Sequence, residues 1–313
     1  MAHPKVVAVV GPNASGKSHY AVELAGLFNG EIISADSRQV YRSLDLGTGK
    51  ITPEEMRGIP HHLMDIIDPG EGYSLFDFQR DAYSAIHAIH AHKRLPIIVG
   101  GTGLYLDAVL EGYRLLDVKP DPMARSKLEA LSMDELMDII RREQPSALHS
   151  IENRNKRRLI RAIEIVRAGF DYRDTRQKSK RLDTLIIGIG WERDTLRERI
   201  RARLHSRLEK GMIEEVEALR ARGVPDGFLF DIGLEYRAIL RYLQGGYDSR
   251  QHFIESLEIA IGQFAKRQMT WFRKRPGITW IDGGNVISPG TADTIRSFMG
   301  REEIAVSSSQ ANS

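Results

Sequence analysis

Cysteine is absent from the 313 residues of this chain. Its absence excludes disulfide bonds, cysteine-based zinc sites and a thiol nucleophile. The chain also lacks an apolar run long enough to span a bilayer, and Met1–Lys5 leads directly into a short apolar segment instead of a signal peptide. The composition, with 42% hydrophobic and 28% charged residues, is typical of a soluble globular protein. We therefore expect a cytoplasmic protein without membrane association.

One segment, Gly11–Ser18, fits the pattern G-x-x-x-x-G-K-[ST] in full. The apolar run Val6–Val10 precedes it and a helix-like stretch, Tyr20–Phe28, follows it, so that strand, loop and helix are in register. Such a loop wraps backbone N–H groups around phosphate oxygens, and the helix N-terminus adds partial positive charge. Lys17 supplies a full charge, and the Ser18 hydroxyl can bind magnesium. The sequence therefore predicts a site for a di- or triphosphate.

Short apolar segments rich in Val or Ile alternate with helical patterns, as in a parallel sheet buried on both faces. Strands are expected at Val6–Val10, Glu31–Ala35, Leu95–Val99, Leu185–Ile189 and Ile278–Ile281. Helices are expected at Met123–Leu131, Met133–Glu143, Arg154–Arg167, Asp194–Arg222 and Ser249–Arg275. Together with the phosphate loop, this order predicts an α/β fold, a P-loop NTPase-like three-layer parallel-sheet core with an α-helical insert domain.

The stretch between the third and fourth strands is too long for a simple crossover, and it contains three of the expected helices. We assign residues 120–181 to the helical insert, and residues 1–119 and 182–300 to the core with its C-terminal helices. Residues 301–313 are polar, rich in serine and without periodicity, so we expect a disordered tail.

Basic residues are concentrated in two places. Residues 154–181 contain eleven Lys or Arg and three acids, a net charge of +8, so the rest of the chain carries −5. The second run comprises Lys266, Arg267, Arg273, Lys274 and Arg275, with Trp271 and Phe272 among them. Such clusters on an otherwise acidic chain are typical of a polyphosphate or nucleic-acid surface, although a solvated helix face gives the same pattern.

Two strand ends carry candidate groups, because ligands of open parallel sheets bind beyond the carboxyl ends of the strands. Asp36 follows the second strand, where a carboxylate can hold magnesium, accept a proton or cap a helix. Gln39 can read a base edge. The third strand ends in Gly100–Thr102, without the acidic residue that orders magnesium in many phosphoryl-transfer enzymes. Glycines at this position either allow a ligand to approach the backbone closely or serve a tight turn between strand and helix. Thr102 can hydrogen-bond a diphosphate oxygen.

Six motifs follow one another along the chain. They are GPNASGKS (11–18), ISADSRQVYR (33–42), LGTGK (46–50), PHHLMDIIDP (60–69), VGGTGLY (99–105) and AKRQMTWFR (265–273). In this order they resemble the tRNA dimethylallyltransferases, also called isopentenyl-diphosphate:tRNA isopentenyltransferases. The resemblance covers about residues 5 to 282. The absence of cysteine excludes the zinc-finger extension of eukaryotic relatives and favours a bacterial form.

The resemblance implies a reaction in which the adenine 3′ to the anticodon of a tRNA, flipped out of its stack, attacks dimethylallyl diphosphate and releases diphosphate. Asp36, Thr102 and Lys17 are implied as catalytic: the carboxylate accepts the amine proton, and the other two groups stabilise the leaving group with Mg²⁺. The implied diphosphate-binding residues are Arg203 and the loop residues Gly11, Pro12, Asn13, Ala14, Ser15, Gly16, Lys17 and Ser18, with Ser18 as metal ligand.

The resemblance also implies that a tRNA anticodon stem-loop binds to a monomer, partly on the 120–181 insert. The implied tRNA-binding residues are Asp36, Ser37, Arg38, Gln39, Thr102, Arg157, Arg158, Arg161, Lys266 and Arg267. Two segments depart from the family pattern: Arg157 replaces the usual Gln, and Ile232–Arg237 differs from the usual Gly-Tyr followed by a basic and an acidic residue.

Three other functions fit parts of the pattern. A nucleoside or nucleotide kinase has the same core and moves a phosphoryl group from ATP. An isopentenyltransferase that acts on free adenine nucleotides needs no large RNA surface. A nucleotide-gated RNA-binding module does no chemistry and leaves Asp36 free to vary.

Overall fold

The computed structural model describes the chain apart from residues 1–2, 150, 152–154, 284–286 and 311–313. The chain divides into two compact units. The first comprises residues 1–73, 80–106 and 182–313, and the second comprises residues 74–79 and 107–181. The insert that the sequence places at 120–181 therefore lies within a second unit that begins earlier, at Asp107, and also includes the segment 74–79.

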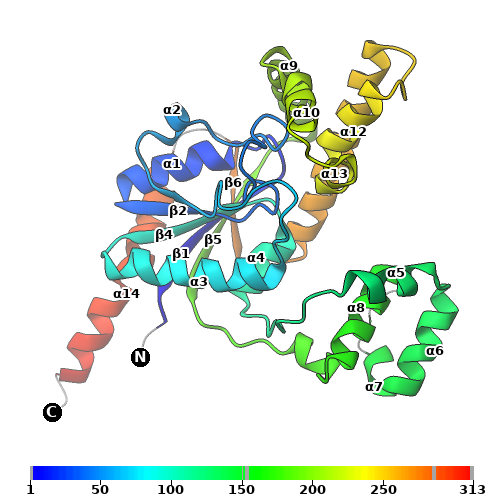
Figure 1. The fold of residues 1–313 in the computed structure, drawn as a ribbon. Coiled ribbons are helices and arrows are strands. Elements are labelled where there is room, and N and C mark those ends of the chain that lie inside the picture. Colours follow the sequence, from blue (N-terminus) through cyan, green and yellow to red (C-terminus); the bar gives the residue numbers. More distant parts are fainter. Residues whose placement is uncertain (1–2, 150, 152–154, 284–286, 311–313) are drawn as a thin grey trace. The chain divides into compact units, whose positions relative to one another are not determined.

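The first unit is built on a six-stranded sheet in the order β3-β2-β4-β1-β5-β6, in which every neighbouring pair is parallel (Figure 1). The strands are β1 (Lys5–Val10), β2 (Gly30–Ser34), β3 (His61–His62), β4 (Leu95–Gly100), β5 (Asp183–Gly190) and β6 (Ile278–Asp282). Five of them agree closely with the predicted strands, whereas β3 was not predicted. Because β1 lies between β4 and β5, the loop after β1 emerges at the position where open sheets bind ligands.

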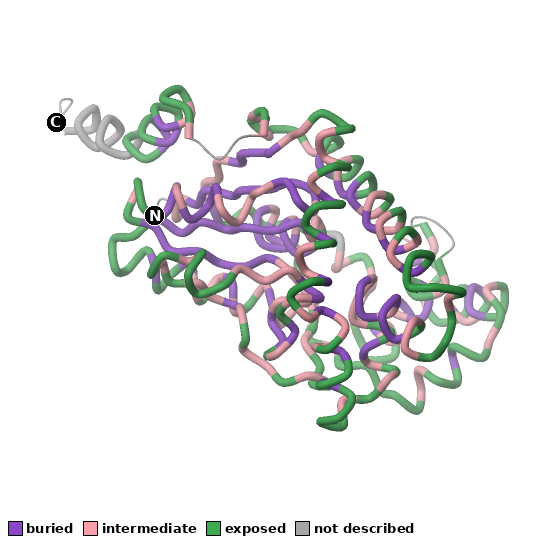
Figure 2. Tube along the Cα trace, turned by 90° about the horizontal axis from the view of Figure 1, so that it is seen from above, coloured by how far each residue is buried: buried purple, intermediate pink, exposed green. Residues whose placement is uncertain are grey.

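The central strands are buried along their whole length (Figure 2), because helices pack on both faces of the sheet. On one face, Val7 and Val9 pack with Tyr20 of α1 (Lys17–Leu27) and with Ile295 and Phe298 of α14 (Pro289–Gln310). On the other face lies α3 (Leu75–Ala91), as Figure 1 shows. This is the three-layer arrangement that the sequence predicts. It places the phosphate loop at the carboxyl end of the central strand β1.

A set of helices follows β5 in the chain and packs on the loop after β2. They are α9 (Arg193–Glu209), α10 (Met212–Ala221), α11 (Asp226–Ile232), α12 (Leu234–Leu243) and α13 (Arg250–Arg273). Tyr41 and Leu44 share one hydrophobic cluster with Leu204, Met212 and Phe253 of these helices. The single helical stretch expected over Asp194–Arg222 is divided into α9 and α10, because Gly211 adopts a left-handed conformation (φ 95°) that ends the first helix.

The second unit is a small helical cluster with its own core. Its helices are α5 (Pro122–Ala130), α6 (Met133–Glu143), α7 (Pro145–Leu148) and α8 (Lys156–Arg167), followed by a 3₁₀ helix over Tyr172–Arg176. Leu136 and Ile140 of α6 pack with Leu159, Ile160 and Ile163 of α8. The three predicted helices of this region are thus present, and Arg154, the expected start of the last one, lies outside the described residues.

The incoming and outgoing segments of the second unit are hydrogen-bonded to each other. The Ser179 N–H donates to the Gly112 carbonyl at 2.8 Å, and the Arg114 N–H donates to the Gln177 carbonyl at 2.9 Å. Gly112 has a φ of 65°, and a Cβ at this position would lie 1.9 Å from the Ser179 oxygen, so only glycine fits. The two ends of the intervening segment are therefore fixed side by side.

Two short helices and the last helix complete the first unit. α2 (Pro53–Met56) follows the loop after β2, and α4 (Gly103–Leu110) begins directly after β4 and continues into the second unit. The hydroxyl of Ser288 accepts the Thr291 N–H at 3.2 Å, so the start of α14 is capped. α14 continues to Gln310, so the backbone is helical over residues 301–310, where the sequence leads us to expect a disordered tail. Residues 311–313 lie outside the described residues.

Candidate active site

The loop Gly11–Ser18 joins β1 to α1 and ends at a helix N-terminus that is open to a ligand. Gly16, the N-cap residue, has a left-handed conformation (φ 87°) and gives no side-chain hydrogen bond, and the first turn of α1 contains no acidic residue. The N–H groups of this turn are therefore available to an anion, which the helix dipole also attracts. Lys17, Ser18, Asn13 and Ala14 line the pocket beside it.

Two cations from distant parts of the chain face this pocket. The ammonium group of Lys17 donates to the Pro12 carbonyl at 3.2 Å, and a guanidinium nitrogen of Arg203 on α9 donates to the Gly49 carbonyl at 2.8 Å. Burial, together with the charge of Arg203, lowers the pKa of Lys17 to about 8, whereas Asp36 acts in the opposite direction. Because both burial and the neighbouring Arg203 disfavour the charged ammonium, a bound anion would stabilise it.

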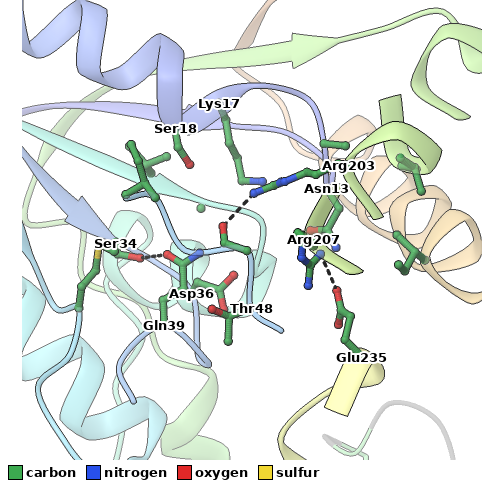
Figure 3. Close-up of a pocket in the computed structure, with 18 of the residues that line it drawn as sticks. Asn13, Lys17, Ser18, Ser34, Asp36, Gln39, Thr48, Arg203, Arg207 and Glu235 are labelled. Carbon is green, nitrogen blue, oxygen red and sulfur yellow. Dashed lines mark hydrogen bonds and ion pairs between the residues drawn. The ribbon is translucent and has the colours of Figure 1, made fainter. Parts of the chain in front are cut away.

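Asp36 follows β2 and lies opposite these cations in the same pocket (Figure 3). Its Oδ1 atom accepts the backbone N–H of Arg38 at 3.0 Å, and the Nε atom of Arg38 lies 3.5 Å from the same oxygen. Within the part of the chain that the structure describes, Oδ2 has no hydrogen-bond partner. One oxygen of the carboxylate is therefore fixed by the protein, and the other is available to accept a proton.

Gln39 stands next to Asp36 and also lines the pocket. The Ser34 hydroxyl donates to its Oε1 atom at 3.0 Å (Figure 3), which fixes the side-chain amide. Its NH₂ group has no protein acceptor among the described residues, so it can donate to a ligand. Apolar side chains supply much of the remaining lining: Ala14, Ile32, Ile51, Met64, Val99, Ile200, Leu204 and Ile261. The pocket thus combines an anion-binding end with apolar walls.

The phosphate loop is held from outside by residues that follow β5. The indole N–H of Trp191 donates to the Ser15 carbonyl at 2.8 Å, and Nε of Arg199 donates to the Ala14 carbonyl at 2.9 Å. The guanidinium of Arg199 also lies 4.3 Å from the centre of the Trp191 ring, in cation–π contact. These contacts fix the Ala14 and Ser15 carbonyl groups and so pre-organise the loop beside the first turn of α1.

Comparison with known proteins identifies the family to which this chain belongs. A model described as IPP transferase matches residues 39–275, which is more than half of the chain. The chain belongs to the IPP transferase family. A model described as isopentenyl transferase matches residues 4–73, the part that carries the phosphate loop and Asp36. The resemblance drawn from the six motifs is thereby confirmed.

Relatives in the IPP transferase family match nearly the whole chain. The tRNA dimethylallyltransferase 2 of Citrifermentans bemidjiense is 46% identical over 290 residues, which cover 90% of this chain and 92% of the relative. The crystal structure of the full-length tRNA isopentenylpyrophosphate transferase from Bacillus halodurans is 38% identical with a TM-score of 0.71, and covers 99% of this chain and 100% of that one. The corresponding protein of Staphylococcus epidermidis is 32% identical with a TM-score of 0.68, over 96% and 99% of the two chains. The predicted fold class is confirmed.

In this member of the IPP transferase family, Thr102, which the resemblance implies to be catalytic, does not line the pocket. Gly100, two residues earlier, does. The Thr102 carbonyl accepts the N–H groups of Tyr105 and Leu106 at 3.0 and 3.1 Å, so this residue begins α4. The neighbouring glycines serve packing within the protein. A Cβ at Gly100 would lie 2.3 Å from the Ala35 carbonyl oxygen, and one at Gly101 would lie 2.5 Å from Nε2 of Gln268. Packing within the protein thus requires glycine at these two positions, and Gly100 also lines the pocket.

The basic segment of the second unit is partly neutralised by ion pairs. Arg167 pairs with Glu143, and Arg173 pairs with Asp171. Arg161, an implied tRNA contact, donates to the Val118 carbonyl at 2.8 Å and to Glu164 at 3.1 Å, so it connects α8 to the start of the unit. Arg157 and Arg158 are exposed in the first turn of α8. Three of the arginines implied to bind tRNA lie in this unit, and one of them, Arg161, makes contacts within the unit itself.

The implied tRNA contacts on α13 are exposed. Lys266 and Arg267 lie on the exposed side of this helix, and the guanidinium of Arg267 is 5.7 Å from the centre of the Phe264 ring. Trp271, one turn further, is 42% exposed and lies against Gly103, where a Cβ would come within 2.4 Å of its indole nitrogen. This face of α13 therefore presents cations and an aromatic ring to solvent, as a nucleic-acid surface requires.

Glu235, at the start of α12, is a buried carboxylate of the pocket that was not predicted from the sequence. It is 2% exposed, and it lies 2.9 Å from Arg38 and 3.5 Å from Arg207 of α9. No local sequence pattern indicates the pair of Arg38 and Glu235, because the two residues are 197 positions apart. Glu235 belongs to the segment Ile232–Arg237 that departs from the family pattern, and this departure was the available signal.

A second missed carboxylate, Glu215 of α10, holds the loop that carries the LGTGK motif. It accepts the N–H groups of Asp45, Leu46 and Gly47 at 3.0, 2.6 and 2.9 Å. It also accepts the hydroxyl of Tyr236 at 2.7 Å. Thr48 and Gly49 of this loop line the pocket, so Glu215 fixes one wall of it.

Magnesium fits the pocket as a companion of the diphosphate. The described residues contain no group of three or more His, Asp or Glu that could hold a metal ion by itself. The Ser18 hydroxyl lines the pocket and has no protein partner among the described residues. Magnesium commonly binds through few protein ligands and several phosphate oxygens, so one hydroxyl beside an anion site is a suitable set.

None of the helices in the described ranges is long and apolar enough to cross a membrane.

Proposed function

We propose that this chain transfers a dimethylallyl group from dimethylallyl diphosphate to the exocyclic amine of the adenine 3′ to the anticodon of a tRNA. The observation that supports this most directly is that Lys17 and Arg203 face Asp36 across one pocket with apolar walls. An anion site, a hydrocarbon site and a proton acceptor are the three parts that this transfer needs. The relatives' names, tRNA dimethylallyltransferase and tRNA isopentenylpyrophosphate transferase, give the same group and acceptor.

The diphosphate binds to the loop Gly11–Ser18. The N–H groups of the first turn of α1, the ammonium of Lys17 and the guanidinium of Arg203 stabilise the negative charge that grows on the leaving oxygen as the carbon–oxygen bond breaks. This is the main catalytic task, because an allylic diphosphate ionises readily. The apolar walls receive the five-carbon chain and keep water away from the allylic cation.

Asp36 acts as the general base. The exocyclic amine of adenine attacks the allylic carbon, a carbon–nitrogen bond forms, and the amine loses a proton. Oδ2 of Asp36 is the available acceptor, since Arg38 holds Oδ1. Gln39, whose NH₂ group is available beside it, donates to an acceptor on the edge of the flipped base.

Magnesium, when bound through Ser18 and the diphosphate, supplies positive charge to the leaving group. The exposed cations of α8 and α13, Arg157, Arg158, Lys266 and Arg267, contact the phosphates of the anticodon stem-loop. Ser37 and Thr102 remain proposed contacts from the resemblance alone. A monomeric state and a cytoplasmic location likewise remain predictions.

A transfer assay with radiolabelled dimethylallyl diphosphate tests the proposal. Unmodified tRNA and AMP are supplied in separate tubes, with magnesium and without ATP, and Lys17→Met serves as the control variant. We expect label in tRNA only, and loss of that label in the variant. Label in AMP would instead assign the chain to the nucleotide-prenylating enzymes. Absence of label in both, with ATP hydrolysed in a parallel tube, would refute prenyl transfer.

A further inference from the structure

Glu235 is a buried carboxylate shared by two arginines from different elements. Its Oε2 atom lies 2.9 Å from Nη1 of Arg38, in the loop after β2, and its Oε1 atom lies 3.5 Å from Nη1 of Arg207 on α9. Glu235 is 2% exposed, and each arginine side chain is 12% exposed, so solvent screens these pairs little. Its position in the first turn of α12 also favours the negative charge.

Arg38 lies between two carboxylates, Asp36 and Glu235. Burial alone would lower its pKa, but these two carboxylates raise the pKa above its ordinary value, so the guanidinium is permanently charged. The hydrogen bond to Glu235 is short, at 2.9 Å, whereas Nε stands 3.5 Å from Oδ1 of Asp36. The shorter side-chain contact of Arg38 is therefore with Glu235, and only one oxygen of Asp36 is engaged.

Gly233 provides room for the same guanidinium. A Cβ at this position would lie 3.0 Å from Cδ and 3.2 Å from Nη1 of Arg38. The backbone of Gly233 is extended (φ 176°), so the conformation itself does not require glycine. The segment Gly233–Glu235 therefore forms a socket for Arg38: one residue leaves space for the side chain and the other pairs with its charge.

We infer that Glu235 is a positioning residue, which holds Arg38 so that Oδ2 of Asp36 remains open to the substrate amine; the inference rests on the proposed function. The physical reason is competition for one guanidinium. An arginine facing a single carboxylate forms the bidentate pair, with two parallel N–H···O bonds. Without the charge of Glu235, Arg38 turns fully onto Asp36, engages both of its oxygens, and makes the carboxylate a weaker base.

The first test compares Glu235→Gln with the unaltered protein in the tRNA transfer assay. We expect kcat to fall about 10- to 100-fold, the range of a weakened general base. The KM for dimethylallyl diphosphate is expected to stay the same or fall, because the variant leaves the pocket more positive. Glu235→Asp, which keeps the charge, is expected to recover part of kcat. A rise in KM with unchanged kcat would overturn the inference.

A double-mutant cycle identifies the route of the effect. If Glu235 acts through Arg38, then Glu235→Gln has no further effect on kcat in an Arg38→Gln background. Arg207 also donates to the Gly47 carbonyl at 2.7 Å. If Glu235 acts through Arg207 and this loop, the full loss of kcat persists in that background, and the inference fails. The matched control is Glu258→Gln on α13, which removes an ion-paired carboxylate outside the pocket and is expected to leave kcat unchanged.

A second variant covers the case in which Glu235→Gln does not fold. Gly233→Ala keeps both carboxylates and an allowed backbone, and its methyl group displaces Arg38 by a few tenths of an ångström. We expect a several-fold lower kcat with an unchanged melting temperature. A folded Gly233→Ala protein with normal kcat would overturn the inference. Failure of the proposed function is distinct, because the unaltered protein would then transfer no label to tRNA.

Discussion

The side chain of Gln268 on α13 accepts the backbone N–H of Asn13 at 2.9 Å and so connects α13 to the phosphate loop. Its amide group also donates to the Gly101 carbonyl at 3.0 Å. Gln268 is 7% exposed, so both hydrogen bonds are buried. One side chain thus connects the loops that follow β1 and β4, which are adjacent strands of the sheet.

Replacing Gln268 by Leu is expected to loosen the phosphate loop. The substitution leaves the Asn13 N–H and the Gly101 carbonyl without buried partners, which costs about 1–3 kcal/mol of unfolding free energy. Binding of pyrophosphate should weaken as well, measured by calorimetry beside urea unfolding. Gln263→Leu, at an exposed position on the same helix, is the control. Equal stability of the two variants would contradict the role of Gln268.

The pKa of Lys17 predicts how anion binding depends on pH. Below about pH 8 the folded protein carries an ammonium at this position, and above it a neutral amine. Because pyrophosphate binds to the charged form, its affinity should fall about tenfold per pH unit as the pH rises beyond 8. Titration calorimetry in EDTA measures this without metal. Lys17→Arg stays charged and reports the ionisation of pyrophosphate itself, so identical pH profiles would rule out Lys17.

Asp36→Asn is expected to lower turnover by a factor of about 10² or more, because the amide cannot accept the amine proton. The amide has nearly the same shape as the carboxylate, so tRNA binding should persist. Single-turnover transfer and a filter-binding assay measure the two effects separately. Asp293→Asn, which alters an exposed carboxylate of α14 outside the pocket, is the control. A rate equal to that of the unaltered protein would remove Asp36 from the mechanism.

Arg157→Glu is expected to weaken tRNA binding and to reduce its dependence on salt concentration. Arg157 is exposed, and its guanidinium has no protein partner among the described residues, so it is available for phosphate. Each phosphate contact that is lost lowers the slope of log K against log salt by about 1. Lys127→Glu makes the same charge change elsewhere in the second unit. If both variants bind alike, the start of α8 is only a solvated face.

The phosphate loop and the main strands could be predicted from sequence because they are local patterns. Val6–Val10 is a continuous buried run, and Gly11–Ser18 has a fixed spacing of glycine, lysine and serine. β3 has only two residues, His61 and His62, too few for any periodicity. The division between α9 and α10 depends on Gly211, and a glycine inside a helical pattern does not always end it.

The bracing of the pocket could not be predicted, because it joins residues far apart in the chain. Glu215 acts on the loop at Asp45, 170 positions earlier, through backbone N–H groups that any residue type possesses. Arg38 is implied by the resemblance to contact tRNA. In the structure its guanidinium lies between the carboxylates of Asp36 and Glu235 and pairs with them. Only the folded arrangement separates a cation that binds a ligand from one that orients a base.

The paired segments at Gly112 and Ser179 give the second unit a property of evolutionary interest. Because residues 114 and 177 are held side by side, the chain enters and leaves the intervening helices at adjacent points. If the intervening helices were deleted, a short turn between residues 114 and 177 would reconnect the chain. A different helical insert could be joined at the same two positions. The fold thus allows these helices to be exchanged while the sheet and the pocket of the first unit are inherited unchanged.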